Sequence, residues 1–333
     1  MKMNKKTLVA VLIAVFLLAV AFLYKSFNPV VKEEKESIKI AASTWPGWSH
    51  VFLAQEKGFF KKNNVDVELI HIHEHIDAQK PFLNGDVDGV FQCLTDTVIQ
   101  NSEIRSKVVY VSDYSSTGDV IVGDVDTLSA LKGKTVGIEG INTFSHIFVL
   151  KALEKAGLSE SDVQFEVVPA HEVLEALEEG RIDAGHTWEP TKSAATQKGY
   201  NILCTAGDMP GIITDLLVFD SEIIKERPED IQAIVKSIAE AQEYRDANWE
   251  ESVEIMAKAV KMSYQDMESG LRGVEPLDLE ANIYAMKESN DTKSLYGSGK
   301  FIAGFYLERG QLPLLPDFDE IIEPKFVSDL KKE

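Results

Sequence analysis

The chain has 333 residues, of which 44% are hydrophobic, and it carries a formal net charge of −20 with a pI near 4.8. A charge of this sign argues against nucleic acid and anionic membrane surfaces as partners, because both would repel the protein. The length exceeds that of one ordinary hydrophobic core and predicts two lobes followed by a set of helices.

The N-terminus differs in kind from the rest of the chain. Lys2, Lys5 and Lys6 precede an uncharged apolar run over residues 7–24, which is typical of an export signal or of a single membrane anchor. Ala19-Val20-Ala21 fits a cleavage site, but the apolar run continues past it and is close to the length of about 20 residues that crosses a bilayer. Cleaved signal and uncleaved anchor both stay open, and both place the body outside the cytoplasm.

The first predicted strand, residues 38–42, ends in a polar and aromatic turn, and a helix is predicted to follow over residues 51–60. Strand, turn and helix in this order are typical of a loop that faces a ligand, because ligands bind beyond the carboxyl ends of strands in an open parallel sheet. Trp45 and Trp48 lie in this turn. Each either offers its ring face to a ligand or packs into the lobe.

Three histidines alternate at the end of the next predicted strand, residues 65–70. His71, His73 and His75 would lie on one face of an extended segment, which is the arrangement that a metal site needs. The alternative is three exposed side chains at a strand end. We favour it, because no further His, Cys or carboxylate supports a metal site at ligand spacing.

One pattern occurs twice in the chain. Residues 84–91 and residues 180–190 each follow a predicted helix, begin with a Gly or Asn-Gly suited to the left-handed position after a helix, and continue into a short strand. Because the carboxyl ends of such strands bind ligands, two sheets that face each other predict a cleft.

Polar and aromatic side chains follow each copy of this pattern. Thr95 or Asp96 stands at a predicted helix start after the first copy, as an N-cap or as a ligand contact. The second copy itself ends with Trp188 and Glu189.

A polar connector, residues 113–119, follows the strand predicted over residues 108–112 and is expected to cross into the second lobe. There Asn142 or Thr143 is a suitable N-cap for a helix over residues 144–156, and the partial positive charge of a helix N-terminus suits an anionic group. The other elements predicted in this part are strands over residues 120–122, 135–138, 163–168 and 200–204, and helices over residues 128–133 and 172–179.

Asp215 interrupts an apolar strand, residues 212–219, which is expected to return to the first lobe. A charge buried in a strand needs a partner, and either a cationic or hydrogen-bonding ligand or a group inside the protein would serve. Cys93 and Cys204 lie in apolar, strand-like segments, which favours two buried thiols over one disulfide. Helices are predicted over residues 227–248, 251–260, 264–271, 279–289 and 299–308.

The combination of these segments resembles the extracytoplasmic solute-binding proteins for nitrate, sulfonates, taurine and thiamine precursors. The resemblance covers about residues 38–318. Its blocks are residues 45–48, 54–60 and 64–69 at the opening, and residues 84–88, 131–137, 180–184 and 188–190 later in the chain.

The resemblance implies an α/β protein with a two-lobed periplasmic-binding-protein-like fold of type 2, which closes on a small ligand and docks to an ABC permease and its ATPase. Residues 1–37 would be the signal or anchor with a linker. Residues 38–115 and 219–333 would form lobe 1 with C-terminal helices packed on it, and residues 116–218 lobe 2. We expect a monomer without cofactor or metal.

Carried over residue by residue, the resemblance points to Trp45, Thr95, Asn142, Thr143, Trp188 and Glu189 as ligand-binding residues, and our reading of single residues adds Trp48 and Asp215. Acidic and aromatic side chains, without Arg or Lys, distinguish these places from those of the oxyanion-binding members. Ring faces and carboxylates favour a nitrogenous or cationic solute. The helix start at Thr143 suits an anionic end, so zwitterionic and sulfonate-like solutes stay open.

The predicted function is capture of a small polar solute for an ABC importer, without enzymatic activity. The sequence contains no nucleophile elbow, phosphate-binding loop or zinc-binding helix signature. One alternative is a ligand sensor domain held at the membrane. A less favoured alternative is an enzyme on the same fold, since fungal pyrimidine-synthesis enzymes resemble this family, but their Cys-rich block has no counterpart here.

Overall fold

The computed structural model describes residues 35–101 and 105–332. Ser37–Glu333 forms one compact unit. The apolar segment that predicts a signal or an anchor lies outside the described residues. Within the described ranges, no helix is both long and apolar enough to cross a membrane.

Six strands form the first sheet, in the order β11-β4-β10-β3-β1-β2. β1 pairs in parallel with β2 and β3, whereas β10 runs antiparallel between β3 and β4, and β11 runs antiparallel beside β4. The return of β10 to this sheet confirms the expectation for the apolar run around Asp215. The bounds are β1 (Ile38–Ala42), β2 (Val67–His71), β3 (Gly89–Cys93), β4 (Ser106–Ser115), β10 (Thr214–Asp220) and β11 (Val274–Pro276).

Five strands form the second sheet, in the order β7-β6-β8-β5-β9. β6 pairs in parallel with β7 and β8, and β5 runs antiparallel between β8 and β9. β9 lies at the edge of this sheet, as expected. The bounds are β5 (Val120–Gly123), β6 (Thr135–Ile138), β7 (Gln164–Val167), β8 (Ala184–Thr187) and β9 (Asn201–Thr205).

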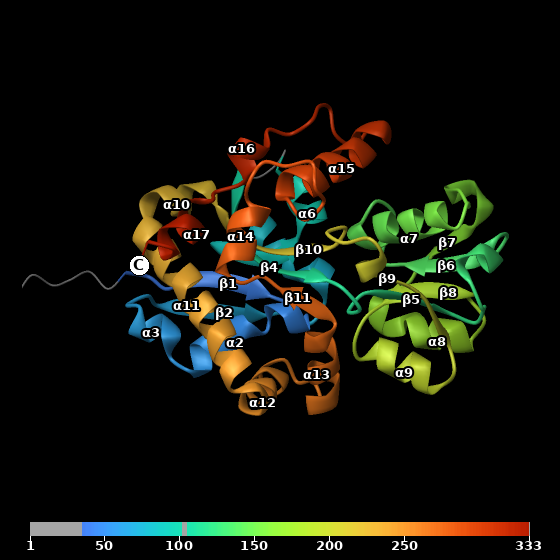
Figure 1. Cartoon of the computed structure of the whole chain (residues 1–333), viewed down its shortest axis with the longest axis horizontal. Helices are drawn as coiled ribbons and strands as arrows, with labels where there is room; N and C mark the ends of the chain where they lie inside the picture. Colours follow the sequence, from blue (N-terminus) through green and yellow to red (C-terminus); the bar gives the residue numbers. More distant parts are fainter. Residues whose placement is uncertain (1–34, 102–104, 333) are drawn as a thin grey trace, which may run out of the picture. The chain divides into compact units, whose positions relative to one another are not determined.

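Helices cover both sheets, and α7 lies on the opposite face of the second sheet from α8 and α9 (Figure 1). Strand β3 is buried along its whole length, which fits a central strand covered on both faces. The helices before β10 are α2 (His50–Glu56), α3 (Phe59–Lys62), α4 (His75–Ala78), α5 (Lys80–Leu83), α6 (Leu94–Gln100), α7 (Phe144–Lys155), α8 (Val173–Glu178) and α9 (Thr191–Gln197), with short 3-10 turns η1 (Pro46–Trp48), η2 (Leu128–Leu131), η3 (Glu160–Asp162), η4 (Ala170–Glu172) and η5 (Ala206–Asp208).

The helices after β10 pack on the first sheet and its helices. α11 packs on α2 and α3, α12 packs on α2, α15 packs on α6, and α17 contacts β4. This arrangement confirms the expected fold class, with C-terminal helices added to the first sheet. Their bounds are α10 (Ser221–Glu226), α11 (Pro228–Ala247), α12 (Trp249–Ala259), α13 (Tyr264–Arg272), α14 (Leu279–Ala285), α15 (Leu295–Glu308), α16 (Phe318–Ile321) and α17 (Lys325–Leu330).

Two crossing segments, residues 116–119 and residues 206–213, connect the sheets. The backbone N–H groups of residues 116–118 all donate to the carbonyl oxygen of Gly273, over 2.8–2.9 Å. The crossing segments also contact each other, since Gly207 N–H donates to the Ser116 carbonyl over 2.6 Å. Lobe boundaries at residues 115/116 and 218/219 stay a prediction.

β4 and β11 differ from the predicted strands. β4 extends to Ser115, beyond the predicted end at residue 112, because β11 pairs with its last residues. β11 has only three residues, ends with Pro276, and lies at the sheet edge, where a missing N–H is tolerated. A strand this short leaves no periodic signal in the sequence.

Candidate functional site

A cavity of about 60 Å³ lies at the carboxyl ends of β1, β3 and β8, in contact with both sheets. This volume has room for only about four or five water molecules, so it suits a small solute. Among the predicted site residues, Trp45, Trp48, Trp188, Glu189 and Asp215 line the cavity. Strand ends in an α/β sheet are the expected place for a ligand.

Aromatic rings form one wall of the cavity. Trp45, in the turn after β1, meets Trp188, at the end of β8, with ring centroids 6.2 Å apart and planes at 90°. Phe144, the first residue of α7, lies 6.1 Å from Trp188. Trp48 also lines the cavity, but it is only 1% exposed and its ring packs against His75 and Phe91. Trp48 is therefore mainly a core residue, whereas Trp45 and Trp188, in edge-to-face contact with each other, both line the cavity.

Two buried carboxyl groups stand beside this wall. Asp215 on β10 lines the cavity, and its strand partner Asp113 on β4 lies behind Trp45, whose Nε1 donates to Asp113 Oδ1 over 3.4 Å. Burial raises the pKa of Asp113 to about 7 and raises the pKa of Asp215 well above its ordinary range. Cys93 Sγ donates to Asp215 Oδ1 over 3.5 Å. The pair therefore retains a proton at neutral pH.

Two histidine–aspartate contacts complete the polar part of the site. His75 Nε2 lies 3.0 Å from Asp96 Oδ2, and His186 Nε2 lies 2.9 Å from Asp119 Oδ1. Burial alone would lower the pKa of His75, but the hydrogen bond with Asp96 and the charges of Asp96, Glu139 and Asp119 together outweigh burial and raise it. Burial also raises the pKa of Glu139, and the positive charge of nearby His75 opposes this rise.

Glu189 is buried and already has partners inside the protein. Its Oε1 lies 2.8 Å from Lys192 Nζ and accepts from the hydroxyl of Ser269 over 2.6 Å, while its Oε2 accepts from the N–H of Ser193 over 3.1 Å. Burial would raise the pKa of Glu189, but the contacts with Lys192, Ser269 and Ser193 together outweigh burial and lower it. Because Ser269 belongs to α13, this carboxylate links the end of β8 to the first-sheet side of the cavity.

Three of the predicted site residues do not line the cavity. Thr95 is buried at the start of α6, and Asn142 and Thr143 lie before α7. Thr143 is the N-cap of α7, as predicted, and its Oγ1 accepts from His146 N–H over 3.4 Å. The carbonyl of Asn142 accepts from the hydroxyl of Tyr306 over 2.9 Å. The start of α7 reaches the cavity through the ring of Phe144 instead.

The predicted N-cap at Thr95 or Asp96 is wrong. Helix α6 starts at Leu94, directly after β3, so Cys93 is the N-cap. Asp96 occupies the third helical position, and its Oδ2 accepts from Cys93 N–H over 3.2 Å. Cys93 and Cys204 are both buried free thiols, as expected.

Sequence reasoning missed several residues of the site. Phe144 and Asp119 line the cavity, and Asp113 and His186 support it from behind. Asp113 and Asp119 do stand in the predicted crossing segment, and His186 in the second copy of the repeated pattern. The sequence therefore offered a reason to consider these three residues as site residues. Phe144 offered none, because it looks like an ordinary apolar residue of a helix.

Of the three alternating histidines, two contact the same hydroxyl. Thr44 Oγ1 lies 3.0 Å from His71 Nε2 and 3.1 Å from His73 Nδ1. The expectation of three exposed side chains at a strand end is wrong for His75, which begins α4 and is buried against Asp96. His73 and His75 line the cavity.

Two mixed sheets joined by two crossing segments, with one aromatic and acidic cavity at their strand ends, define the periplasmic-binding-protein class of fold. Solved structures agree: the ligand-binding component of an ABC-type import system from Staphylococcus aureus, solved with zinc bound, has a TM-score of 0.73 and 17% identity, and covers 89% of this chain and 99% of its own. The periplasmic aliphatic sulphonate binding protein of Escherichia coli has a TM-score of 0.70 and 19% identity, over 87% of this chain and 93% of its own.

The sequence model of the family described as NMT1/THI5 like matches residues 45–252, and the chain belongs to this family. A protein of Brucella abortus that carries a provisional name as a binding protein is 25% identical over 281 residues, which are 79% of this chain and 83% of the relative.

Proposed function

We propose that this protein is the solute-binding component of an ABC importer, which captures a small solute between its two sheets and delivers it to a membrane permease driven by an ATPase. Membership in the family, the fold and the cavity at the strand ends support this proposal. Such a function requires the solute to bind the closed arrangement of the sheets more tightly than the open one. The protein would act outside the cytoplasm, where its N-terminal segment would export or anchor it.

The single observation that carries the class of solute is the combination of Trp45 and Trp188 with the buried carboxyl of Asp215 in one small cavity. Tryptophan faces attract cations, and a desolvated carboxylate needs a positive or hydrogen-donating partner. Among the described residues that line the cavity, none is Lys or Arg. We therefore propose a nitrogenous solute with a cationic or hydrogen-donating group, such as an amine, an amidine-like heterocycle or a zwitterion.

A sulfonate-like solute is less favoured by the same geometry. Its charge would face the carboxylates that line the cavity, and the N-terminus of α7 is closed by the side chain of its own N-cap, Thr143. The anionic end of a zwitterion would still find donors in the hydroxyls of Ser43 and Thr44, which also line the cavity.

A membrane-held sensor would use the same cavity and differ only in its partner. The experiment that separates the two is uptake: deletion of the gene should abolish import of the solute if the protein serves a permease, and should leave import intact if it serves a sensor.

The first test of the solute class is a thermal-shift screen of the purified full-length protein with amines, betaines, pyrimidines, taurine, alkyl sulfonates and nitrate. A ligand that binds only the folded state must raise the melting temperature. We expect a shift with nitrogenous compounds. A shift with sulfonate or nitrate alone would contradict the proposed class of solute.

A further inference from the structure

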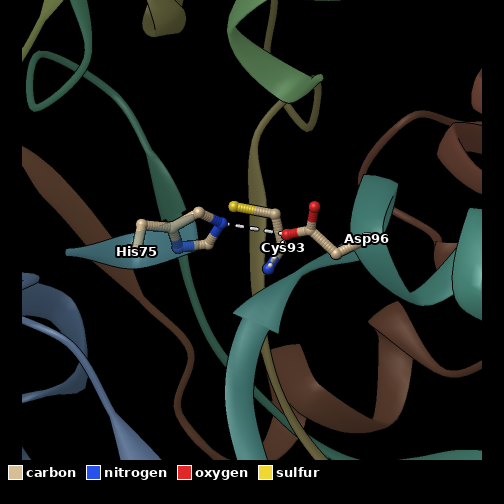
Figure 2. Close-up of side chains that lie close together, drawn as sticks. All are labelled: His75, Cys93 and Asp96. Carbon is tan, nitrogen blue, oxygen red and sulfur yellow. Dashed lines mark hydrogen bonds and ion pairs between the residues drawn. The ribbon is translucent and has the colours of Figure 1, made fainter. Parts of the chain in front are cut away.

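Three side chains of different chemistry meet beside the cavity. His75 begins α4, Cys93 ends β3, and Asp96 lies in the first turn of α6. One ligand atom from each, the imidazole nitrogen, the thiol sulfur and a carboxylate oxygen, lies within 4.8 Å of the other two. Figure 2 shows the three side chains pointing toward one another, with the hydrogen bond from the imidazole to the carboxylate as a dashed line.

The surroundings of this group are buried and acidic. His75 is 7% exposed and Cys93 4% exposed, and the side chain of Asp96 is 14% exposed. The carboxyls of Asp119, Glu139 and Asp215 are close enough to act on His75 or Cys93. In the part of the chain that the structure describes, the recorded ion pairs of Asp96 and Asp119 go to His75 and His186, not to Lys or Arg.

We propose that His75, Cys93 and Asp96 form a binding site for a divalent transition-metal ion of the Zn²⁺ type. Imidazole, thiolate and carboxylate are the three side-chain ligands that Zn²⁺ uses in proteins, with bonds of about 2.0–2.3 Å. Donor atoms around one such ion lie roughly 3–4 Å apart, so the observed cluster needs only small side-chain movements to close on the ion. The mixture of nitrogen, sulfur and oxygen favours Zn²⁺ or Co²⁺ over Mg²⁺ or Ca²⁺, which prefer oxygen alone.

The site would leave one coordination position on the side of the cavity. His75 and Cys93 line the cavity, whereas Asp96 approaches them from the start of α6. Three protein ligands with a fourth position open is the arrangement of zinc sites that bind a further molecule. A nitrogen or oxygen atom of the captured solute, or a water molecule, would take that position. The metal site itself does not depend on the identity of the solute.

The same contacts have a purely structural alternative. Asp96 closes the first turn of α6 through the N–H of Cys93, and His75 pairs with Asp96. This alternative uses Cys93 only as a thiol, which donates to Asp215 Oδ1, whereas the metal site requires it as a thiolate. Metal binding would release the thiol proton to solvent, because the thiolate is the species that coordinates the metal.

The test measures metal binding by the purified full-length protein under reducing conditions. With Zn²⁺ in competition with a chromophoric chelator, we expect one ion per chain. With Co²⁺, we expect the near-ultraviolet charge-transfer band of a thiolate–cobalt bond. Titration calorimetry in buffers of different ionisation enthalpy should report about one released proton per ion.

The decisive variant is Cys93→Ser, which keeps the size of the side chain. We expect it to weaken Zn²⁺ binding by more than about tenfold, since even outer partners of metal ligands commonly contribute that much, and to remove the charge-transfer band. The matched control is Cys204→Ser, because Cys204 is the other buried thiol and also donates to a carboxylate, Asp208 Oδ2, over 3.6 Å. The control should bind Zn²⁺ as the parent protein does.

Three outcomes would overturn the metal site: no stoichiometric ion in the parent protein, equal Zn²⁺ affinity of Cys93→Ser and the parent, or a Co²⁺ complex without the thiolate band. His75→Gln provides a second variant, and its thermal unfolding shows whether loss of binding comes from loss of the ligand or of the fold. A folded His75→Gln protein with unchanged Zn²⁺ affinity would also overturn the proposal.

Discussion

Asp113 and Asp215 are paired across neighbouring antiparallel strands, both carboxyls are buried, and burial together with the charge of Asp113 raises the pKa of Asp215. Two neighbouring buried carboxyls retain a proton at neutral pH, since two buried negative charges would repel each other. Asp215 lines the cavity and Asp113 holds the indole of Trp45. The protonation state of these two carboxyls is therefore linked to the position of the Trp45 ring in the cavity wall.

The first prediction concerns the pH dependence of stability. Because burial raises the folded pKa of Asp113 to about 7, its contribution to stability is complete below its unfolded pKa and is lost as the pH rises through about 7. Asp113→Asn should therefore reduce the loss of unfolding free energy between about pH 4 and pH 7. Urea unfolding at several pH values measures this difference. The exposed control Asp86→Asn should follow the parent protein, and parallel curves for Asp113→Asn and the parent would contradict the prediction.

The second prediction concerns His50, which is fully buried, with both ring nitrogens lacking a hydrogen-bond partner among the described residues. Burial lowers the pKa of His50 to about 3, below its value of 6.5 in the unfolded chain. As the pH falls from about 6.5 toward 3, the unfolded chain takes up a proton that the folded protein does not, so the folded protein loses stability over this range. His50→Leu should remove a loss of up to roughly 3 kcal/mol at pH 4.

Urea unfolding at pH 7 and pH 4 measures the effect of His50→Leu. The control is His73→Leu, because the side chain of His73 is 72% exposed and its removal should leave the acid-side loss intact. An equal loss of stability on acidification in parent and His50→Leu would show that His50 is not the group that titrates.

The third prediction concerns the aromatic wall. Trp188→Ala should weaken binding of a nitrogenous solute by at least about tenfold, since a tryptophan ring contributes both contact area and attraction for a cation. Calorimetry with a compound found by the thermal-shift screen measures the affinity. Trp249→Ala is the matched control, because Trp249 lies on α12 and donates to Glu268. If Trp188→Ala binds the solute with unchanged affinity, the solute does not bind in this cavity.

The fourth prediction concerns the link between Glu189 and Ser269. Ser269→Ala should weaken binding of charged and neutral solutes alike, by about five- to tenfold, because it removes a hydrogen bond of about 1 kcal/mol or more from the closed arrangement. The matched control is Ser193→Ala, which keeps the backbone N–H that donates to Glu189. A loss confined to cationic solutes would instead place the charge of Glu189 in direct contact with the solute.

The sequence predicts the fold well where one segment carries its own signal. The strand over residues 38–42 and the strand over residues 135–138 have the predicted bounds, because each is a short apolar run between turn residues. The N-cap of α7 at Thr143 is likewise a local property, set by a hydroxyl before an apolar helix.

The site is less predictable because its contacts join distant residues. Glu189 finds its partner Ser269 80 residues later in the chain, and no local pattern announces that pairing. Cys93 lies beside His75 because α4 packs against β3. His75 and Cys93 are far apart in the sequence, so their spacing does not predict this contact. Trp45 and Trp188 could be predicted to line a cavity because each follows a predicted strand, and Asp215 could be predicted because its charge interrupts an apolar strand.

The three N–H groups of residues 116–118 that converge on the carbonyl of Gly273 fix the first crossing segment to the first-sheet side. If the second sheet rotates on solute binding as proposed, the rotation would begin beyond Gly118, at Asp119, whose carboxylate lines the cavity and contacts His186. A solute bound in the cavity would then lie close to the axis of the proposed rotation. A small displacement at Asp119 would then become a larger one at the outer surface, where a permease would contact the protein.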